Sequence, residues 1–297
     1  MKALAEFVMR GRFQALLVTM ACAGSLMLCW LSAAVVALVT LRKGTAQGAW
    51  LLLWAVLPAG ALLLFLGDSG PLALLLSTTA LAVVLRSTLS LPFAVLSTVP
   101  LGVLSGLALL LFGQGMLEQM VGFFDQFLSS LEQQLSGSGD SAVELLRPTA
   151  LQIAGMMGAA NAIVALACLM LARWWQAMLY NPGGFAKEFR ALYFPPVVAA
   201  VLSVAALALV GLGIEYRSWA VIVLIPFGFA GLALVHARVA WRGQGTGWLL
   251  GFYLAWLFFD PLKLLVVFAA IADSWFKFRQ RWVSKSDAPN DSDEDQN

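Results

Sequence analysis

Four polar side chains interrupt the apolar stretches of this chain and are the residues best placed to do chemistry there. They are Arg86, Asn161, Asp260 and Lys263. Asp260 and Lys263 carry opposite charges three positions apart, beside the helix-breaking Pro261. Ionisable groups at membrane depth mark functional sites, and broken helices can bind ligands. The pattern predicts a site for a ligand or ion. The alternatives are an internal ion pair that fixes a turn and, for Asn161, a hydrogen bond between helices.

The residue types give little support to other chemistry. His236 is the single histidine, and Cys22, Cys29 and Cys168 lack the spacing of metal ligands or of a redox pair. The sequence shows no serine motif and no convergent acid and base groups. We therefore expect a protein that is not an enzyme, that needs no metal or cofactor, and that binds no nucleic acid.

Long apolar helices are the elements expected to position the four polar residues. Hydrophobic residues make up 61% of the chain, charged residues 11%, and the mean hydropathy is +0.86. Soluble globular domains have about 25% charged residues, so water is not the expected main solvent. Apolar runs of about 18 residues or more can cross a bilayer as helices. The eight apolar segments are residues 13–41, 50–67, 71–84, 91–112, 150–172, 194–214, 219–235 and 247–272.

The first and last of these segments are expected to cross and return. Residues 13–41 would form a helix of about 43 Å, longer than the roughly 30 Å hydrocarbon core. If both segments are helix pairs, all basic residues except Arg147, Arg217 and Lys263 fall on one side, the cytoplasmic side. We predict an all-α polytopic membrane bundle of roughly 8–10 membrane helices or half helices. It would form one domain over residues 1–283, with both termini cytoplasmic.

The longest polar interval is predicted to face outward. Residues 114–149 begin with apolar residues at helical spacing, opposite an acidic stripe of Glu118, Asp125 and Glu132. This pattern predicts an extracytoplasmic amphipathic helix, and the Ser-Gly repeat at 136–141 predicts a flexible return. Such a helix covers the bilayer surface or the bundle, or acts as a lid or docking helix.

An elbow over residues 173–196 and a motif near the C-terminus are the most distinctive polar sequences. The elbow turns at Asn-Pro-Gly-Gly and opens a short helix. Basic and aromatic residues alternate in both, which suits an anionic inner leaflet. Beyond them, residues 284–297 are predicted to be a disordered acidic tail. The residues expected to contact lipids or a protein partner at the cytoplasmic face are Trp174, Asn181, Pro182, Gly183, Gly184, Phe185, Glu188 and Arg190 in the elbow, and Asp273, Trp275 and Arg279 in the C-terminal motif.

Together, residues 173–196 and 271–281 resemble the YybS-like family of bacterial membrane proteins. The resemblance lies in the Pro-Gly-Gly-Phe elbow, which leads into a basic helix and a proline, and in the closing Asp273, Trp275, Phe278 and Arg279. It implies an inner-membrane protein without an assigned activity. The chain also resembles, in fold, the substrate-binding subunits of energy-coupling vitamin transporters, which are small apolar helical bundles. It is longer than those subunits and lacks a recognisable vitamin-binding pattern.

Two functions follow as hypotheses. A binding or transport subunit for a small molecule or lipid would line a polar cavity with Arg86, Asn161, Asp260 and Lys263. A non-catalytic scaffold or assembly component of a membrane complex would instead pair and pack these groups, and would use the elbow and the outer helix as contact surfaces. The residue pattern determines neither the substrate nor the oligomeric state.

Overall fold

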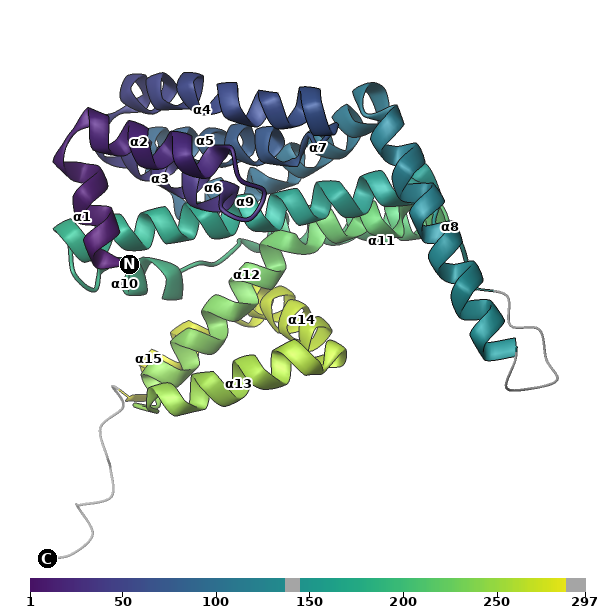
Figure 1. The fold of residues 1–297 in the computed structure, drawn as a ribbon. Coiled ribbons are helices and arrows are strands. Elements are labelled where there is room, and N and C mark those ends of the chain that lie inside the picture. Colours follow the sequence, from purple (N-terminus) through teal and green to yellow (C-terminus); the bar gives the residue numbers. More distant parts are fainter. Residues whose placement is uncertain (137–144, 287–297) are drawn as a thin grey trace, which may run out of the picture. The chain divides into compact units, whose positions relative to one another are not determined.

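The computed structural model describes residues 1–136 and 145–286, which are helical apart from turns and short connections (Figure 1). No β-strand occurs in these two ranges, so the all-α prediction is confirmed. The sequence predicts one domain over residues 1–283, and the structure groups the chain into two compact units. Unit 1 is Met1–Phe185 with Ser203–Pro226, and unit 2 is Ala186–Leu202 with Phe227–Asn297.

Two predicted flexible segments fall largely outside the described residues. The return at 136–141 lies there beyond Ser136, the last residue of α8 (Gln114–Ser136). The predicted acidic tail lies there from residue 287 onward, whereas α15 (Phe278–Ser286) extends through its first three residues.

Unit 1 is built around α9 (Ala150–Tyr180), a 31-residue helix. A capping box starts this helix, because the Thr149 side chain and the Gln152 side chain each bond the other's backbone N–H. The helices that pack most extensively on α9 are α3 (Cys29–Lys43), α5 (Gly70–Thr88) and α7 (Thr98–Phe112), and α4 (Thr45–Leu66) packs on α3 and α5. The other complete elements of unit 1 are α1 (Lys2–Arg10), α2 (Arg12–Ala23), α6 (Leu91–Leu96), α8 and the short 3₁₀ helix η1 (Ile214–Tyr216).

Small residues set the close approach of α7 and α9. A Cβ atom added at Gly158 would lie 2.5 Å from the carbonyl oxygen of Gly102, and one at Gly106 would lie 2.9 Å from the carbonyl oxygen of Ala154. The two backbones therefore touch with no room for a side chain between them. This is the packing that small residues four positions apart allow between apolar helices.

The first and last apolar segments each form two helices, as predicted. Residues 13–41 divide into α2 and α3, and the Ser32 hydroxyl donates to the carbonyl of Thr19 at 2.9 Å to hold them together. Residues 247–272 divide into α13 (Thr246–Phe258) and α14 (Asp260–Phe276), which meet at Phe259 with a bend of 114°. Pro261 lies in the first turn of α14, where a missing N–H costs nothing.

Unit 2 contains α13, α14, α15 and parts of three other helices. The unit boundaries fall inside α10 (Gly184–Arg190), α11 (Pro196–Gly211) and α12 (Arg217–Trp241). In α12 the boundary directly follows Pro226. Proline removes a backbone hydrogen bond inside a helix, so this position is a weak point in the α12 ladder.

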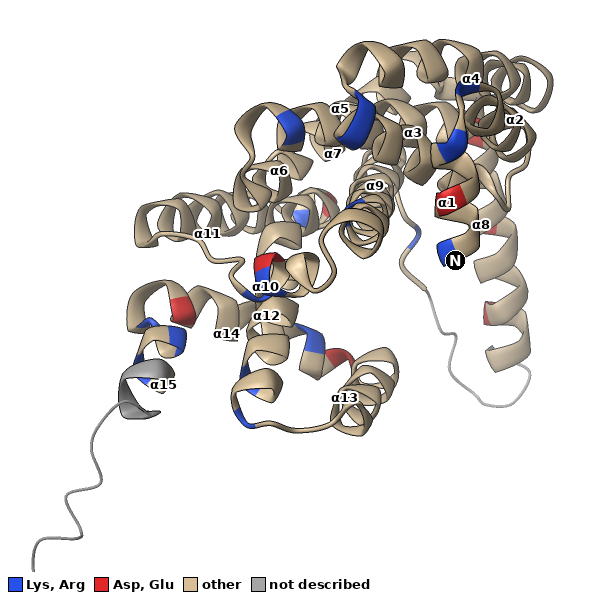
Figure 2. Ribbon diagram, turned by 90° about the vertical axis from the view of Figure 1, so that its left-hand side faces the viewer, with Lys and Arg blue, Asp and Glu red and all other residues tan. Residues whose placement is uncertain are grey.

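Five helical stretches of the described chain are long and apolar enough to cross a membrane, and the bent α13–α14 pair would make six. The five are Thr45–Leu66, Gly70–Thr88, Leu91–Phe112, Ala150–Tyr180 and Ile214–Trp241, while Arg12–Ala23 and Pro196–Gly211 are shorter apolar helices. Figure 2 shows that charged residues are sparse and gather mainly near helix ends and connections. This distribution agrees with the helical membrane class expected from composition.

Candidate functional site

The four polar residues predicted to form a ligand site are divided between the units. Arg86 and Asn161 belong to unit 1, and Asp260 and Lys263 belong to unit 2. Each has partners within its own unit, so each pair is described by itself.

Arg86 caps a helix in unit 1. Its Nη1 donates to the carbonyl oxygen of Leu41 at 2.6 Å and to that of Thr40 at 3.4 Å, both in the last turn of α3. Carbonyls at a helix C-terminus have no partner in their own helix, and a cation there is favourable. Gln176 of α9 donates to the same Leu41 carbonyl at 3.4 Å. Arg86 therefore provides hydrogen-bond donors to backbone carbonyls at the C-terminal end of α3.

Asn161 joins three helices. Its Nδ2 donates to the hydroxyl of Ser77 on α5 at 2.9 Å and to that of Ser105 on α7 at 2.7 Å. Both donor hydrogens of the amide are thus used between helices, which is the alternative role expected from the sequence.

Asp260 and Lys263 pair with each other in the first turn of α14. Their N···O distance is 2.6 Å, and 88% of the Asp260 side chain is exposed in this chain. The pair lies at the bend between α13 and α14, as the sequence predicts, but it is exposed rather than internal. Lys263 also lies 5.5 Å from the centre of the Trp256 ring. An exposed ion pair of this kind contributes little to stability in water.

The elbow presents an exposed turn at the end of α9. Asn181, Pro182 and Gly183 are all exposed, and Gly183 has φ +82°, a conformation that suits glycine. Trp174 in the preceding helix is 41% exposed. These four residues are accessible at the surface of the chain, which the predicted contact with a partner or with lipid headgroups requires.

The remaining elbow residues are less accessible. Gly184, Phe185, Glu188 and Arg190 are partly buried. A Cβ atom at Gly184 would lie 2.4 Å from the Asn181 side-chain amide, so a larger residue there would require the Asn181 side chain to move.

The second half of the elbow and the C-terminal motif meet in unit 2. Arg279 lies 3.1 Å from the Asp273 carboxylate, and Asp273 is buried. The Nη1 of Arg279 donates to the Arg190 carbonyl at 2.6 Å, and its Nη2 donates to the Ala230 carbonyl on α12 at 3.2 Å. The motif residues Asp273 and Arg279 thus fasten α14, α15, α10 and α12 together. Trp275, the third residue of the motif, is 48% exposed.

A second contact supports this junction. The Tyr193 hydroxyl, three residues beyond Arg190, donates to the carbonyl oxygen of Ser274 at 3.0 Å. The two sequences that carry the family resemblance are therefore in direct contact over residues 190–193 and 273–279, and their polar groups serve the fold.

A cavity of about 590 Å³ lies in unit 1 beside α8. Its apolar wall includes Leu110 at the end of α7 and Leu117 and Val121 on α8, and its polar groups include Gln114 and Glu118. The other lining residues are Gly122, Asp125, Arg147, Pro148 and Ala150. Pockets of about 300–1,000 Å³ with mostly apolar walls and a few polar groups are typical of small-molecule sites.

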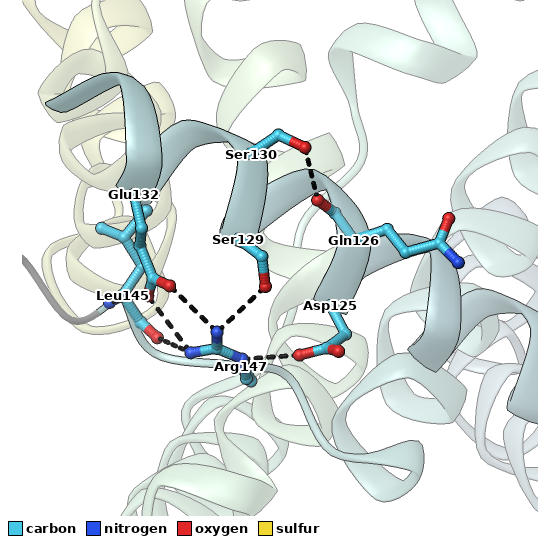
Figure 3. A network of polar contacts seen from close by, with 7 residues as sticks. All are labelled: Asp125, Gln126, Ser129, Ser130, Glu132, Leu145 and Arg147. Carbon is cyan, nitrogen blue, oxygen red and sulfur yellow. Dashed lines mark hydrogen bonds and ion pairs between the residues drawn. The ribbon is translucent and has the colours of Figure 1, made fainter. Parts of the chain in front are cut away.

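Arg147 is one of the residues that line this cavity, and its hydrogen bonds hold α8 to the segment that follows it (Figure 3). Its Nε donates to Asp125 at 2.6 Å. Its Nη1 donates to Glu132 Oε1 at 3.2 Å and to the Leu145 carbonyl at 3.3 Å. Its Nη2 donates to Glu132 Oε2 at 3.0 Å and to the Ser129 hydroxyl at 3.3 Å. These contacts account for all five guanidinium hydrogens.

The network changes the titration of its members. Hydrogen bonds from Arg147, and then the bond from the Leu145 N–H at 2.7 Å, lower the pKa of Glu132 below its ordinary value. The same carboxylates, Glu132 first and then Asp125, raise the pKa of Arg147. Arg147 has no donor left over, and Asp125 uses one carboxylate oxygen to accept from it. Among the described residues, Glu118 and Gln114 are the polar side chains of the cavity without a hydrogen-bond partner.

Sequence reasoning did not identify the role of Arg147. A signal was present, since Arg147 is the single basic residue between Arg86 and Arg173 and follows an acidic stripe of period seven. Two of the three stripe residues, Asp125 and Glu132, pair with it, while Glu118 lines the cavity.

Within the described residues, no group of three or more His, Cys, Asp or Glu side chains could hold a metal ion. Comparison of the chain with protein-family models, with curated proteins and with solved structures gives no match.

Proposed function

We propose that this chain is a multi-pass protein of a bacterial inner membrane, a member of the YybS-like family, and a binding or transport subunit for a small molecule or lipid. The ligand would bind in the cavity beside α8. That cavity is the observation that supports the proposal, because it combines an apolar wall with polar side chains, Glu118 and Gln114, that have no hydrogen-bond partner among the described residues.

The walls and the free polar groups suggest the type of ligand. Leu110, Leu117 and Val121 suit an apolar body, and the Glu118 carboxylate suits an amine or hydroxyl donor. The Arg147 guanidinium is saturated by its own partners, so it adds no anion site. An amphiphile with a donor group at one end matches this arrangement.

Occupancy of the cavity can be tested by filling it. Gly122 lines the cavity and has open space where a Cβ atom would lie, so Gly122→Leu would add side-chain volume at the cavity. Gly115→Leu, on the same helix and also in open space, is the matched control. We expect mass spectrometry of the detergent-purified protein to detect a co-purifying molecule in the wild type and the control, and to detect less of it in Gly122→Leu. Equal retention in all three proteins would refute binding at this site.

The proposed topology places α8 outside and both termini inside. Basic residues support it, because the arrangement leaves Arg147 and Arg217 outside and nearly all others inside. Single cysteines at Leu146 and Gly183, both exposed, would be introduced in a chain lacking Cys22, Cys29 and Cys168. An impermeant thiol reagent should label them from opposite faces. Labelling from one face would contradict the topology.

A scaffold role is the second candidate, with a protein partner at the cytoplasmic face. It is favoured because Arg86, Asn161 and Arg279 all serve the fold, while the elbow turn is exposed. Gly183→Ala would strain the turn at φ +82°, and Gly243→Ala would impose the same kind of strain in another loop, at φ +63°. A scaffold predicts that cross-links to a cytoplasmic partner are lost in the first variant and kept in the second. Cross-links retained in both would argue against partner recognition by the elbow.

A further inference from the structure

An arginine and two tryptophans form a compact cluster in unit 2. The guanidinium carbon of Arg238 lies 4.6 Å from the centre of the Trp241 ring on the same helix, and 4.7 Å from that of the Trp282 ring on α15. The two rings have their centres 6.1 Å apart and are tilted by 32°. We call Arg238, Trp241 and Trp282 the indole cluster. Two aromatic faces hold its guanidinium through cation–π contacts.

The hydrogen-bonding edge of Arg238 is unused. Arg86 and Arg279 both donate to backbone carbonyls. Arg238 has neither a hydrogen-bond acceptor nor a carboxylate partner among the described residues. Cation–π contacts use no hydrogen-bond acceptor, so a guanidinium that makes them keeps N–H groups that can donate to a ligand.

The two helices that carry the cluster are basic. Arg242 follows Arg238 by one helical turn and is exposed, and its backbone N–H donates to the Arg238 carbonyl at 3.0 Å. Neither α12 nor α15 contains an Asp or Glu residue. Trp241 is 41% exposed and Trp248, at the start of α13, is 48% exposed. Exposed indoles beside basic residues are typical of the headgroup level of a bilayer.

We propose that the indole cluster binds the phosphate group of an anionic membrane lipid. A guanidinium held beside two indole rings can donate two parallel hydrogen bonds to phosphate oxygens, and the two tryptophans would lie beside the acyl chains below. The occupant is a lipid and not free phosphate, because the cluster combines one oriented cation with exposed aromatic surface. This site is in unit 2 and does not depend on the cavity beside α8.

Native mass spectrometry of the delipidated full-length protein tests the proposal. The probes are phosphatidylglycerol, phosphatidylcholine and inorganic phosphate. We expect the wild type to bind phosphatidylglycerol in preference to the other two. Arg238→Gln and Trp282→Leu should each weaken phosphatidylglycerol binding by about tenfold, the value of one charge-assisted hydrogen bond or one desolvated cation–π contact. Arg238→Lys, which keeps the charge and loses the planar donors, should weaken it nearly as much.

Arg217→Gln is the matched control, because Arg217 is an exposed arginine at the start of the same helix. It removes the same charge and should leave lipid binding unchanged. Thermal unfolding of each variant in detergent identifies any that fails to fold, and Arg238→Lys then carries the comparison. Unchanged binding in Arg238→Gln, an equal loss in Arg217→Gln, or equal binding of inorganic phosphate would each overturn the proposal.

Discussion

The carboxylate of Asp273 lies 3.1 Å from the guanidinium of Arg279. Between these two residues in the sequence, Lys277 adopts a left-handed backbone conformation with φ 50°. That residue ends α14 and lets the chain turn back into α15. The turn brings Arg279 beside the last turn of its own preceding helix, and its two other nitrogens then reach carbonyls on α10 and α12. One side chain therefore joins four helices of unit 2.

This buried pair should respond asymmetrically to substitution. Asp273→Leu or Arg279→Met alone leaves an uncompensated charge in a buried place, at a cost of about 3–5 kcal/mol, whereas the double variant should be much milder. Unfolding in detergent measures both. Asp260→Leu is the control, since Asp260 is 88% exposed, and it should change stability by less than about 1 kcal/mol. Additive effects of the two single variants would contradict a coupled pair.

The second half of α8 should depend on Arg147. Arg147→Gln removes the cation that bonds Asp125 and Glu132, so α8 should separate from the segment after it. Arg147→Lys cannot serve both carboxylates in the planar geometry of a guanidinium and should restore the contact only in part. Spin labels at the exposed Gln133 and Leu146 report the separation. A narrow, unchanged distance distribution in Arg147→Gln would count against this role.

The same contact should weaken at acidic pH. The pKa of Glu132 is lower in the folded chain than in an unfolded one, because Arg147 bonds its charged form. Its contribution is therefore fully present above the pKa of an unfolded glutamate, about 4.3, and is lost as the pH falls through the lower folded pKa. The spin-label distance should stay constant through neutral and mildly acidic pH and then increase. In Glu132→Gln this transition should be missing.

The contact between α7 and α9 should not tolerate a methyl group. A Cβ atom at Gly158 would lie 2.5 Å from the Gly102 carbonyl oxygen, so Gly158→Ala must push two helices apart. Overpacking of this kind costs about 1–3 kcal/mol. Gly60→Ala on α4, where the space is open, should be neutral or stabilising because alanine favours the helix. Thermal unfolding of both variants gives the comparison, and similar melting temperatures would contradict the close packing.

Much of the fold could be predicted from the sequence. Segment length, hydrophobic period and helix breakers predict three features: the helical class, the division of residues 13–41 and 247–272 into helix pairs, and the amphipathic helix that starts near Gln114. These act over one or two helical turns, so neighbours along the chain determine them. The glycine at position 183 is also explained by local structure, because its φ of +82° disfavours residues with a side chain.

The partners of the charged residues were decided by tertiary structure alone. Arg147 bonds Asp125 across 22 positions, Arg86 bonds Leu41 across 45, and Arg279 bonds the Arg190 carbonyl across 89. The sequence shows that each of these arginines lies near apolar segments, where an unpaired charge is unfavourable. A carboxylate, a helix C-terminus or a ligand can each pair with a guanidinium, with similar energy. Which of them it meets depends on how distant helices pack, and the charge itself does not determine that packing.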